Sequence, residues 1–313
     1  MDHPMSFAET QAVNEGFVAR LKSGNAETIS KLASVIKEEL ILSILREDGI
    51  SRRVLAYRPI SNAELQPDEK NPDVPSTLVP VEPRFGEYLA TAVDFMQPSK
   101  EVWFRSRLAR VYFKPIKTKM ITLTEMQLLA NSFPIRSYLE SIAHNDILVV
   151  EDISLVEAIE RCVARFAATN ALATAAPLTK DIIADAKKAM SRNRLDMELV
   201  MTNEITYHDV LKWNSAEVGS LVMEPIIEFG PKGEQFKYKS WFGLKWVLTN
   251  NEDVIPENIL YYLPPQRFLG VAYMLADAEQ FLEFRDGILR TNTREIVARN
   301  ILNPRGPIKQ TLA

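Results

Sequence analysis

Apolar residues recur at helical spacing near the start of the chain. Between residues 26 and 46 they stand mostly three or four positions apart, at Ile29, Leu32, Ala33, Ile36, Leu40, Ile44 and Leu45. This spacing places them on one face of a helix, which Asn25 would cap and Gly49 would end. A weaker pattern from Phe7 to Leu21 predicts a further helix. Residues 1–58 are therefore expected to form a helical arm.

Prolines dominate the next stretch, residues 59–84. They stand at Pro59, Pro67, Pro72, Pro75, Pro80 and Pro83. Proline lacks a backbone donor and fixes its own φ, so this density disfavours both a helix and a central strand. We expect an extended segment. Because a long structureless piece is uncommon inside a compact domain, the segment fits an assembly in which neighbouring subunits order it.

The pattern turns to strands between residues 85 and 121. Apolar residues stand at Val102, Phe104, Leu108, Val111 and Phe113. Basic residues stand between or beside them at Arg105, Arg107, Arg110 and Lys114. Such alternation predicts a β-hairpin, with Pro98-Ser99-Lys100 as its turn.

Helical spacing returns over residues 122–175. Thr124 would cap a short helix, and Pro134 would restart the chain for a second one. Glu151-Asp152 is expected to open a third helix that reaches Phe166, because early acidic residues suit the positive end of a helix dipole. We expect a capping or solvated role for this acidic pair.

The remaining pattern predicts an α/β unit over residues 176–285, followed by a C-terminal strand and tail over 286–313. A helix begins at Leu178 to Asp181, with four residues on one face: Ile182, Ile183, Ala186 and Met190. Another helix is expected near 206–213. Strands are expected at 198–202, 221–229, 236–241, 243–249, 259–263 and 268–275, and beyond about residue 281. Gly230-Pro231-Lys232-Gly233 is a strong turn signal between two of them.

The composition of the chain disfavours several classes of function. The 313 residues are 46% hydrophobic and 25% charged, as in globular proteins. With 37 basic and 41 acidic residues the net charge is −4, whereas a dedicated nucleic-acid binder carries a basic excess. If this protein lies next to nucleic acid, we expect it to form the wall of a container around it. No run approaches the ~20 apolar residues of a membrane span. The start, Met1 to Met5, lacks a basic region followed by an apolar run, so we expect no secretory signal and use in the cytosol.

Candidate chemistry is sparse. Cys162 lies in an apolar helical pattern and is expected to be a buried core thiol. The histidines His3, His144 and His208 are far apart, and His144 is expected at a helix end. No GxGxxG, Walker-type or Gly-x-Ser-x-Gly motif is present. The sequence therefore predicts no enzyme, and no catalytic, cofactor or metal site.

Aromatic residues stand beside basic ones at Trp103-Phe104-Arg105 and at Phe236-Lys237-Tyr238-Lys239. Bases could stack on such rings. Strand alternation, with aromatic side chains inward and cations outward, explains both runs more simply.

The order of the predicted pieces resembles the tailed-phage major capsid protein of the Hong Kong 97 type over roughly residues 85–310. The stretch Ser240 to Asn250 is similar to the family's Gly-hydrophobic strand that ends in a polar turn. The following pieces resemble its next strands and its late asparagine: Val254 to Leu263, Arg267 to Tyr273 and Asn300-Ile301. Asp181 to Arg194, followed by Leu199-Val200-Met201, is similar to the start of the family's axial domain.

The resemblance implies an α+β Hong Kong 97-type fold. Its parts would be an N-terminal arm (1–58), an extended segment (59–84), an extension loop (85–121), peripheral helices (122–175), an axial domain (176–285) and a C-terminal strand and tail (286–313). Candidate intersubunit contacts are Trp103, Phe104, Arg105, Arg107 and Arg110. Some members of the family cross-link a loop lysine to an asparagine, which here could be Lys100 with Asn250, Asn251 or Asn300. We favour a solvated turn position for Lys100 over such a cross-link.

The same resemblance implies a shell of hexamers and pentamers around double-stranded DNA, located in the virion and assembled in the host cytoplasm. Partners would be the chain itself, a scaffolding protein, a portal, a decoration protein and packaged DNA contacted non-specifically, with no membrane. Two alternatives stay open. One is an encapsulin shell, which the proline-rich segment disfavours. The other is an α+β enzyme or binding domain, which would show a discrete pocket and a small oligomer.

Overall fold

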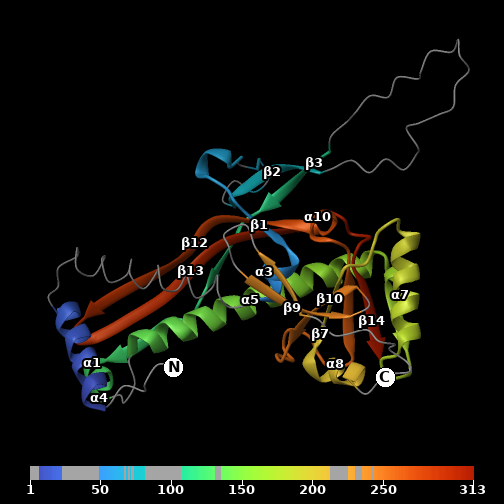
Figure 1. Cartoon of the computed structure of the whole chain (residues 1–313). Helices are drawn as coiled ribbons and strands as arrows, with labels where there is room; N and C mark the ends of the chain where they lie inside the picture. The colour runs from blue at the N-terminus through green and yellow to red at the C-terminus, as the bar shows by residue number, and fades with distance from the viewer. Residues whose placement is uncertain are drawn as a thin grey trace, which may run out of the picture.

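A computed structural model describes residues 7–22, 49–66, 68–69, 71, 74–81, 107–130, 135–211, 225–229, 235–241 and 243–313. The chain folds as an α+β protein around one long helix, α5 (Ile135–Arg165). Figure 1 shows α5 running from one end of the molecule, beside α1 (Phe7–Lys22) and α4 (Glu125–Ala130), to the other end near α7 (Lys180–Arg192). At 1.5 Å per residue the 31 residues of α5 span about 46 Å.

The course of α5 differs from the helices predicted for residues 122–175. The sequence predicted a helix break at Glu151-Asp152, but α5 is continuous there and both carboxylates are buried. His144 likewise lies inside α5 and not at a helix end. The acidic pair sits mid-helix because buried cations and backbone amides satisfy it, as described below.

A seven-stranded sheet forms the larger layer, in the order β6-β14-β11-β7-β10-β9-β8. The strands are β6 (Ala171–Thr174), β7 (Leu199–Asn203), β8 (Pro225–Phe229), β9 (Gln235–Trp241), β10 (Leu244–Thr249), β11 (Ile259–Leu263) and β14 (Ile308–Leu312). Both faces are covered. Tyr261 packs with the core on the α5 side, and its neighbour Tyr262 packs with the core on the α7 side, as the two-residue period of a strand requires.

The elements of this layer agree with the sequence pattern. The four predicted residues of α7 are all buried: Ile182, Ile183, Ala186 and Met190. The predicted helix near 206–213 is α8 (Glu204–Leu211), and the strand predicted at 259–263 is β11. The pair β8–β9 is antiparallel as expected, while its predicted turn at 230–233 lies outside the described residues.

A second sheet has five strands and is built on one long hairpin. β12 (Gly270–Arg285) pairs antiparallel with β13 (Ile288–Ile301), and the other strands are β1 (Ala56–Pro59), β4 (Lys114–Lys117) and β5 (Ile121–Thr124). The hairpin turn is Asp286-Gly287, with φ of 53° and 74°, which suits a tight turn that needs positive φ. The boundary predicted after residue 285 therefore falls inside a single hairpin.

A two-stranded ribbon projects above this sheet (Figure 1). It pairs β2 (Ser76–Val81) with β3 (Arg107–Tyr112). Strands thus occur within the proline-rich stretch, contrary to the prediction of an extended segment without them. Pro59 lies in the edge strand β1 and Pro80 in the ribbon strand β2, positions that tolerate a missing ladder donor.

Short helices complete the fold. They are α3 (Ile50–Val54), η1 (Asn62–Glu64), α6 (Ala167–Asn170) and α10 (Gln266–Leu269). The predicted helix from Phe7 to Leu21 is confirmed as α1, which packs on α4 and the tip of β13 through Phe17, Val18 and Leu21. The predicted helix at 26–46 and the predicted turn at 98–100 lie outside the described residues.

Candidate assembly site

The ribbon strand β3 has one attached face and one free face. Val111 and Phe113 are buried in a cluster with Tyr273 of β12. On the alternate positions Leu108 is 59% exposed and Tyr112 is 40% exposed. Large apolar side chains at such exposure favour a contact surface. The free face of β3 is therefore a candidate contact with another molecule.

Polar contacts fix the base of the ribbon. Tyr112 donates its hydroxyl proton to Asp68 Oδ2 at 2.5 Å, and this hydrogen bond raises the pKa of Tyr112. Arg110 Nη1 donates to Ser76 Oγ and to the carbonyl of Gln66, each at 3.2 Å. These contacts hold β2 and β3 in one orientation relative to the turn at residues 66–71.

The sequence-predicted contact residues are placed only in part. Arg107 opens β3, and Arg110 lies on its free face with contacts inside its own chain. Trp103, Phe104 and Arg105 lie outside the described residues, as does Lys100. The intersubunit role of all five candidate residues stays a prediction.

A buried anchor joins α3 and β1 to α5 and β13. It consists of Arg52, Tyr57, Glu151, Glu295 and Arg299. Arg52 Nε donates to Glu151 Oε2 at 2.9 Å, and its Nη2 donates to Glu295 Oε1 at 3.1 Å. Arg299 Nη2 lies 2.9 Å from Glu151 Oε1, an ion-pair distance at which its N–H is not aligned as a hydrogen bond. Tyr57 donates to the same Oε1 at 3.2 Å.

Electrostatics support this pairing. Burial alone lowers the pKa of Arg52, but the nearby Glu151 and Glu295 carboxylates outweigh it and raise that pKa above its ordinary value. Burial, and then Glu151, raise the pKa of Tyr57. Arg52 and Arg299 are therefore charged at any ordinary pH, and Tyr57 stays a hydrogen-bond donor. The anchor fixes where the chain passes from the arm region into the second sheet.

Asp152 holds the start of α3 from a distant position in the sequence. Its two carboxylate oxygens accept from the backbone N–H groups of Ser51 at 2.7 Å and Ile50 at 3.2 Å. Burial raises the pKa of Asp152 to about 7. A Cβ at Gly49 would lie 2.8 Å from Leu148 Cδ2, so the close approach of this segment to α5 requires a small residue. The predicted capping or solvated role of the acidic pair at its own helix is therefore wrong, because both carboxylates are buried within α5 and only Asp152 bonds to a helix start, that of α3.

Sequence reasoning missed the cationic half of the anchor. The partners of Arg52 stand 99 and 243 residues away, and no local pattern announces such a pairing. The one available signal is the adjacent pair Arg52-Arg53 directly before the apolar Val54-Leu55. Two adjacent arginines are common in exposed segments, so the pair alone does not identify a buried anchor.

Cys162 and His208, the remaining candidates whose side chains the structure describes, do not form a reactive centre. Cys162 is half-buried against the core on the α5 side, and burial raises the pKa of its thiol, which disfavours the nucleophilic thiolate. His208 is exposed on α8. In the described part of the chain, no three His, Cys, Asp or Glu side chains gather as metal ligands. No helix of that part is long and apolar enough to cross a membrane.

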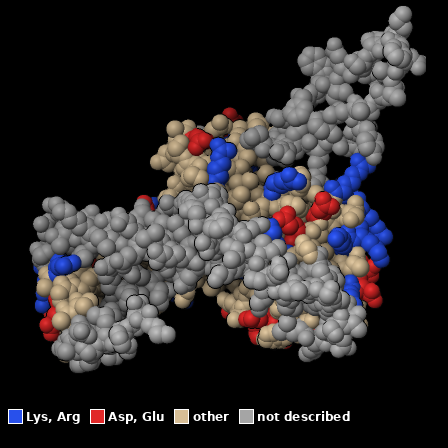
Figure 2. Space-filling model, in the orientation of Figure 1, with Lys and Arg blue, Asp and Glu red and all other residues tan. Residues whose placement is uncertain are grey.

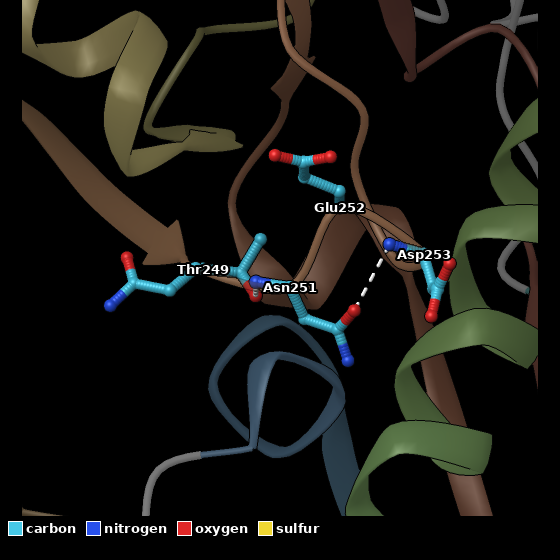
Figure 3. A pocket seen from close by; sticks show the side chains of 5 residues that line it. Thr249, Asn251, Glu252 and Asp253 are labelled. Carbon is cyan, nitrogen blue, oxygen red and sulfur yellow. Dashed lines mark hydrogen bonds between the residues drawn. The ribbon is translucent and has the colours of Figure 1, made fainter.

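The turn after β10 lines a shallow surface hollow (Figure 3). Its residues are Thr249, Asn250, Asn251, Glu252 and Asp253. Asn251 Oδ1 accepts from the backbone of Asp253 at 3.0 Å, and the backbone N–H of Asn251 donates to Thr249 Oγ1 at 3.1 Å. These bonds shape the turn itself. In Figure 3 the Glu252 and Asp253 carboxylates point away from each other, which is unlike the converging groups of an enzyme pocket.

Comparison with models of known protein families finds no match, and no curated protein is similar in sequence. Solved structures are similar in fold. A structure from Microbacterium phage Oxtober96 matches with a TM-score of 0.57 at 10% identity, over 86% of this chain and 92% of that one. The asymmetric unit of the bacteriophage PhiM1 mature capsid gives 0.55 at 7% identity, over 85% and 88%.

The capsid structure of the cyanophage P-SCSP1u gives a TM-score of 0.52 at 12% identity, over 86% of this chain and 89% of that one. At such identities these comparisons concern the fold. The α+β fold of phage capsid subunits, predicted from the order of elements in the sequence, is confirmed.

Proposed function

We propose, on the premise of a fold shared with phage capsid subunits, that this chain is the major capsid protein of a tailed phage. It self-assembles into hexamers and pentamers, which form the icosahedral head around double-stranded DNA. The observation that carries the proposal is the coverage of the fold match to a mature phage capsid, 85% of this chain and 88% of its counterpart. A shared fold does not by itself fix a function, so the surfaces below supply the second support.

The architecture suits assembly in three places. The seven-stranded sheet with α7 and α8 would be the axial unit that meets its neighbours around capsomer axes. The helix α5 with the five-stranded sheet would be the peripheral unit between capsomers. The ribbon β2–β3 would be the base of an extension loop that crosses a neighbouring subunit. Its free face carries the exposed Leu108 and Tyr112, and many such weak contacts act together in a closed shell.

The proposal includes partners and location. A scaffolding protein, a portal and a decoration protein would act with the shell, which is assembled in the host cytoplasm and ends in the virion. Packaged DNA would be contacted only non-specifically, and a net charge of −4 suits a wall whose contact with DNA is weak, because strong sequence-independent binding needs many unpaired cations. The chain would have no catalytic role.

Assembly of a matched pair of variants tests the proposal. Leu108→Glu places a charge on the free face of β3, and Met126→Glu places the same charge on α4, where Met126 is 82% exposed. We expect wild type and Met126→Glu to sediment as shells, tubes or rings after expression with the products of the neighbouring genes. Leu108→Glu is expected to sediment as free subunits with an unchanged circular dichroism spectrum.

Small monodisperse species for the wild type under every assembly condition would contradict the proposal and favour an enzyme or binding domain. Shells that carry a portal and DNA distinguish a phage head from an encapsulin, which would enclose protein cargo.

A further inference from the structure

One end of the seven-stranded sheet carries a cluster of arginines, named here the basic end. It consists of Arg161 and Arg165 on α5, Arg192 on α7, and Arg305 before β14, all of them exposed. The guanidinium carbons of Arg165 and Arg305 lie 5.8 and 5.4 Å from the centre of the Phe166 ring. Two positively charged guanidinium groups therefore lie beside the same aromatic ring. Figure 2 shows Lys and Arg side chains on the side of the molecule where α7 lies, with Asp and Glu side chains between them.

Two asparagine side chains hold the basic end together by donating to one backbone carbonyl. Asn193, next to Arg192, donates from its side chain to the carbonyl of Arg305 at 3.0 Å, and Asn170 donates to the same carbonyl at 3.0 Å. No carboxylate of the described chain forms an ion pair with Arg161, Arg165, Arg192 or Arg305. Positive charges held close together without a counter-charge repel one another in a single subunit. A negative partner would relieve this repulsion.

The opposite end of the sheet carries the complementary charge. Glu252, Asp253 and Glu257 are exposed in the turn between β10 and β11, named here the acidic turn. No Lys or Arg of the described chain forms an ion pair with these three carboxylates. Internal hydrogen bonds of Asn251 fix the shape of this turn, so its carboxylates are presented on a rigid loop.

Strand directions place the two clusters at opposite ends. Ile259, which follows the acidic turn, pairs with Thr311 near the end of β14, whereas Tyr262 pairs with Ile308 at its start. Arg305 precedes Ile308 and therefore lies at the far end. At ~3.3 Å per residue the five residues of β11 separate these ends by about 16 Å. Each subunit is thus polar along the strand direction of this sheet.

We propose that the acidic turn of one subunit docks on the basic end of a second copy of this chain in a head-to-tail contact. Such a contact pairs two different surfaces, so it closes into a ring when the rotation between subunits permits. This inference rests on the proposed capsid function and specifies which surfaces meet within a capsomer. It is an electrostatic contact at the protein surface, so its strength falls with salt as the Debye length shrinks from about 10 Å at 0.1 M to about 3 Å at 1 M.

Charge reversal tests the contact in four proteins. The first reverses the acidic turn (Glu252→Lys, Asp253→Lys, Glu257→Lys). The second reverses the basic end (Arg165→Glu, Arg192→Glu, Arg305→Glu), and the third carries both reversals in one chain. The fourth is a control that matches the change of net charge of the first reversal at exposed acidic residues elsewhere (Glu15→Lys, Glu69→Lys, Glu283→Lys). Thermal melting by circular dichroism confirms that each subunit folds, and sedimentation with electron microscopy measures the assembled fraction.

The head-to-tail contact predicts a distinctive pattern. Each single reversal should lower the assembled fraction at low salt about tenfold or more, since like charges now face each other across every contact of a ring. The double reversal and the control should assemble as the wild type does. A 1:1 mixture of the two single reversals should form rings in which the variants alternate. Alternation closes six-membered rings but not five-membered ones, so tubes or sheets should replace closed shells.

Several results would overturn the contact while leaving the proposed function intact. These are normal shells from either single reversal, no rescue in the double reversal, or closed shells from the mixture. Normal shells that lose DNA when the basic end is reversed would assign this surface to nucleic acid and reject the contact between copies. A wild type that never assembles would reject the proposed function, and the contact with it.

Discussion

Replacing Glu151 with glutamine tests the buried anchor directly. The substitution keeps the shape of the side chain and an oxygen that accepts from Tyr57, but it removes the negative charge between two cations. The Glu151 side chain is 0% exposed, Arg52 is 12% exposed and Arg299 is 7% exposed. Removing one member of a buried charge pair costs about 3–5 kcal/mol, because the remaining charge is left without compensation. Glu295 stays near both arginines and offsets part of this cost.

Urea denaturation of the unassembled subunit measures this cost. Glu157→Gln on the exposed side of the same helix is the matched control, with an expected change within about 0.5 kcal/mol. The denaturation midpoint of Glu151→Gln should fall with an unchanged slope, which indicates a change in stability alone. Removing both charges, in Glu151→Met with Arg299→Met, should recover part of the loss. A Glu151→Gln stability within about 1 kcal/mol of the control would refute the account of the anchor.

Two further predictions follow from single positions. The pKa of Asp152, raised by burial to about 7, means that its protonated form stabilises the fold fully below pH ~4 and that this contribution is lost as pH rises through about 7. The stability of the wild type relative to Asp152→Asn should therefore fall by about 2–3 kcal/mol between pH 5 and pH 8, and a flat difference in urea titrations would contradict this. At Gly270 a Cβ would lie 2.2 Å from the backbone oxygen of Asn300. Gly270→Ala should cost about 1–3 kcal/mol, whereas Gly16→Ala, with nothing within 4 Å in helix α1, should stabilise by up to about 1 kcal/mol.

Local patterns were sufficient for elements whose burial follows from their own residues. One face of α7 is apolar at helical spacing, and β11 is a short run of apolar residues that is buried on both faces. The break predicted at Glu151-Asp152 was wrong because acidic residues mark a helix start only when they are solvated. Here Arg52 and Arg299, far away in the sequence, neutralise Glu151 inside the helix.

The strands in the proline-rich stretch were missed for a related reason. Proline excludes a residue from the centre of a sheet, but Pro59 lies in an edge strand and Pro80 in a two-stranded ribbon. Which strands are edges depends on pairings across long sequence separations, such as Ser76 with Tyr112. The candidate contact residue Arg110 was identified by alternation alone, but its bonds to Gln66 and Ser76 required the folded chain.

Cryo-electron microscopy of particles formed by the wild-type chain with its neighbouring gene products shows whether this chain builds a capsid. We expect closed icosahedral shells with five- and six-membered rings, into which this subunit fits with the seven-stranded sheet at the ring axis. Particles without such rings, or a chain that stays a monomer or dimer whenever it is folded, would contradict the proposed capsid function.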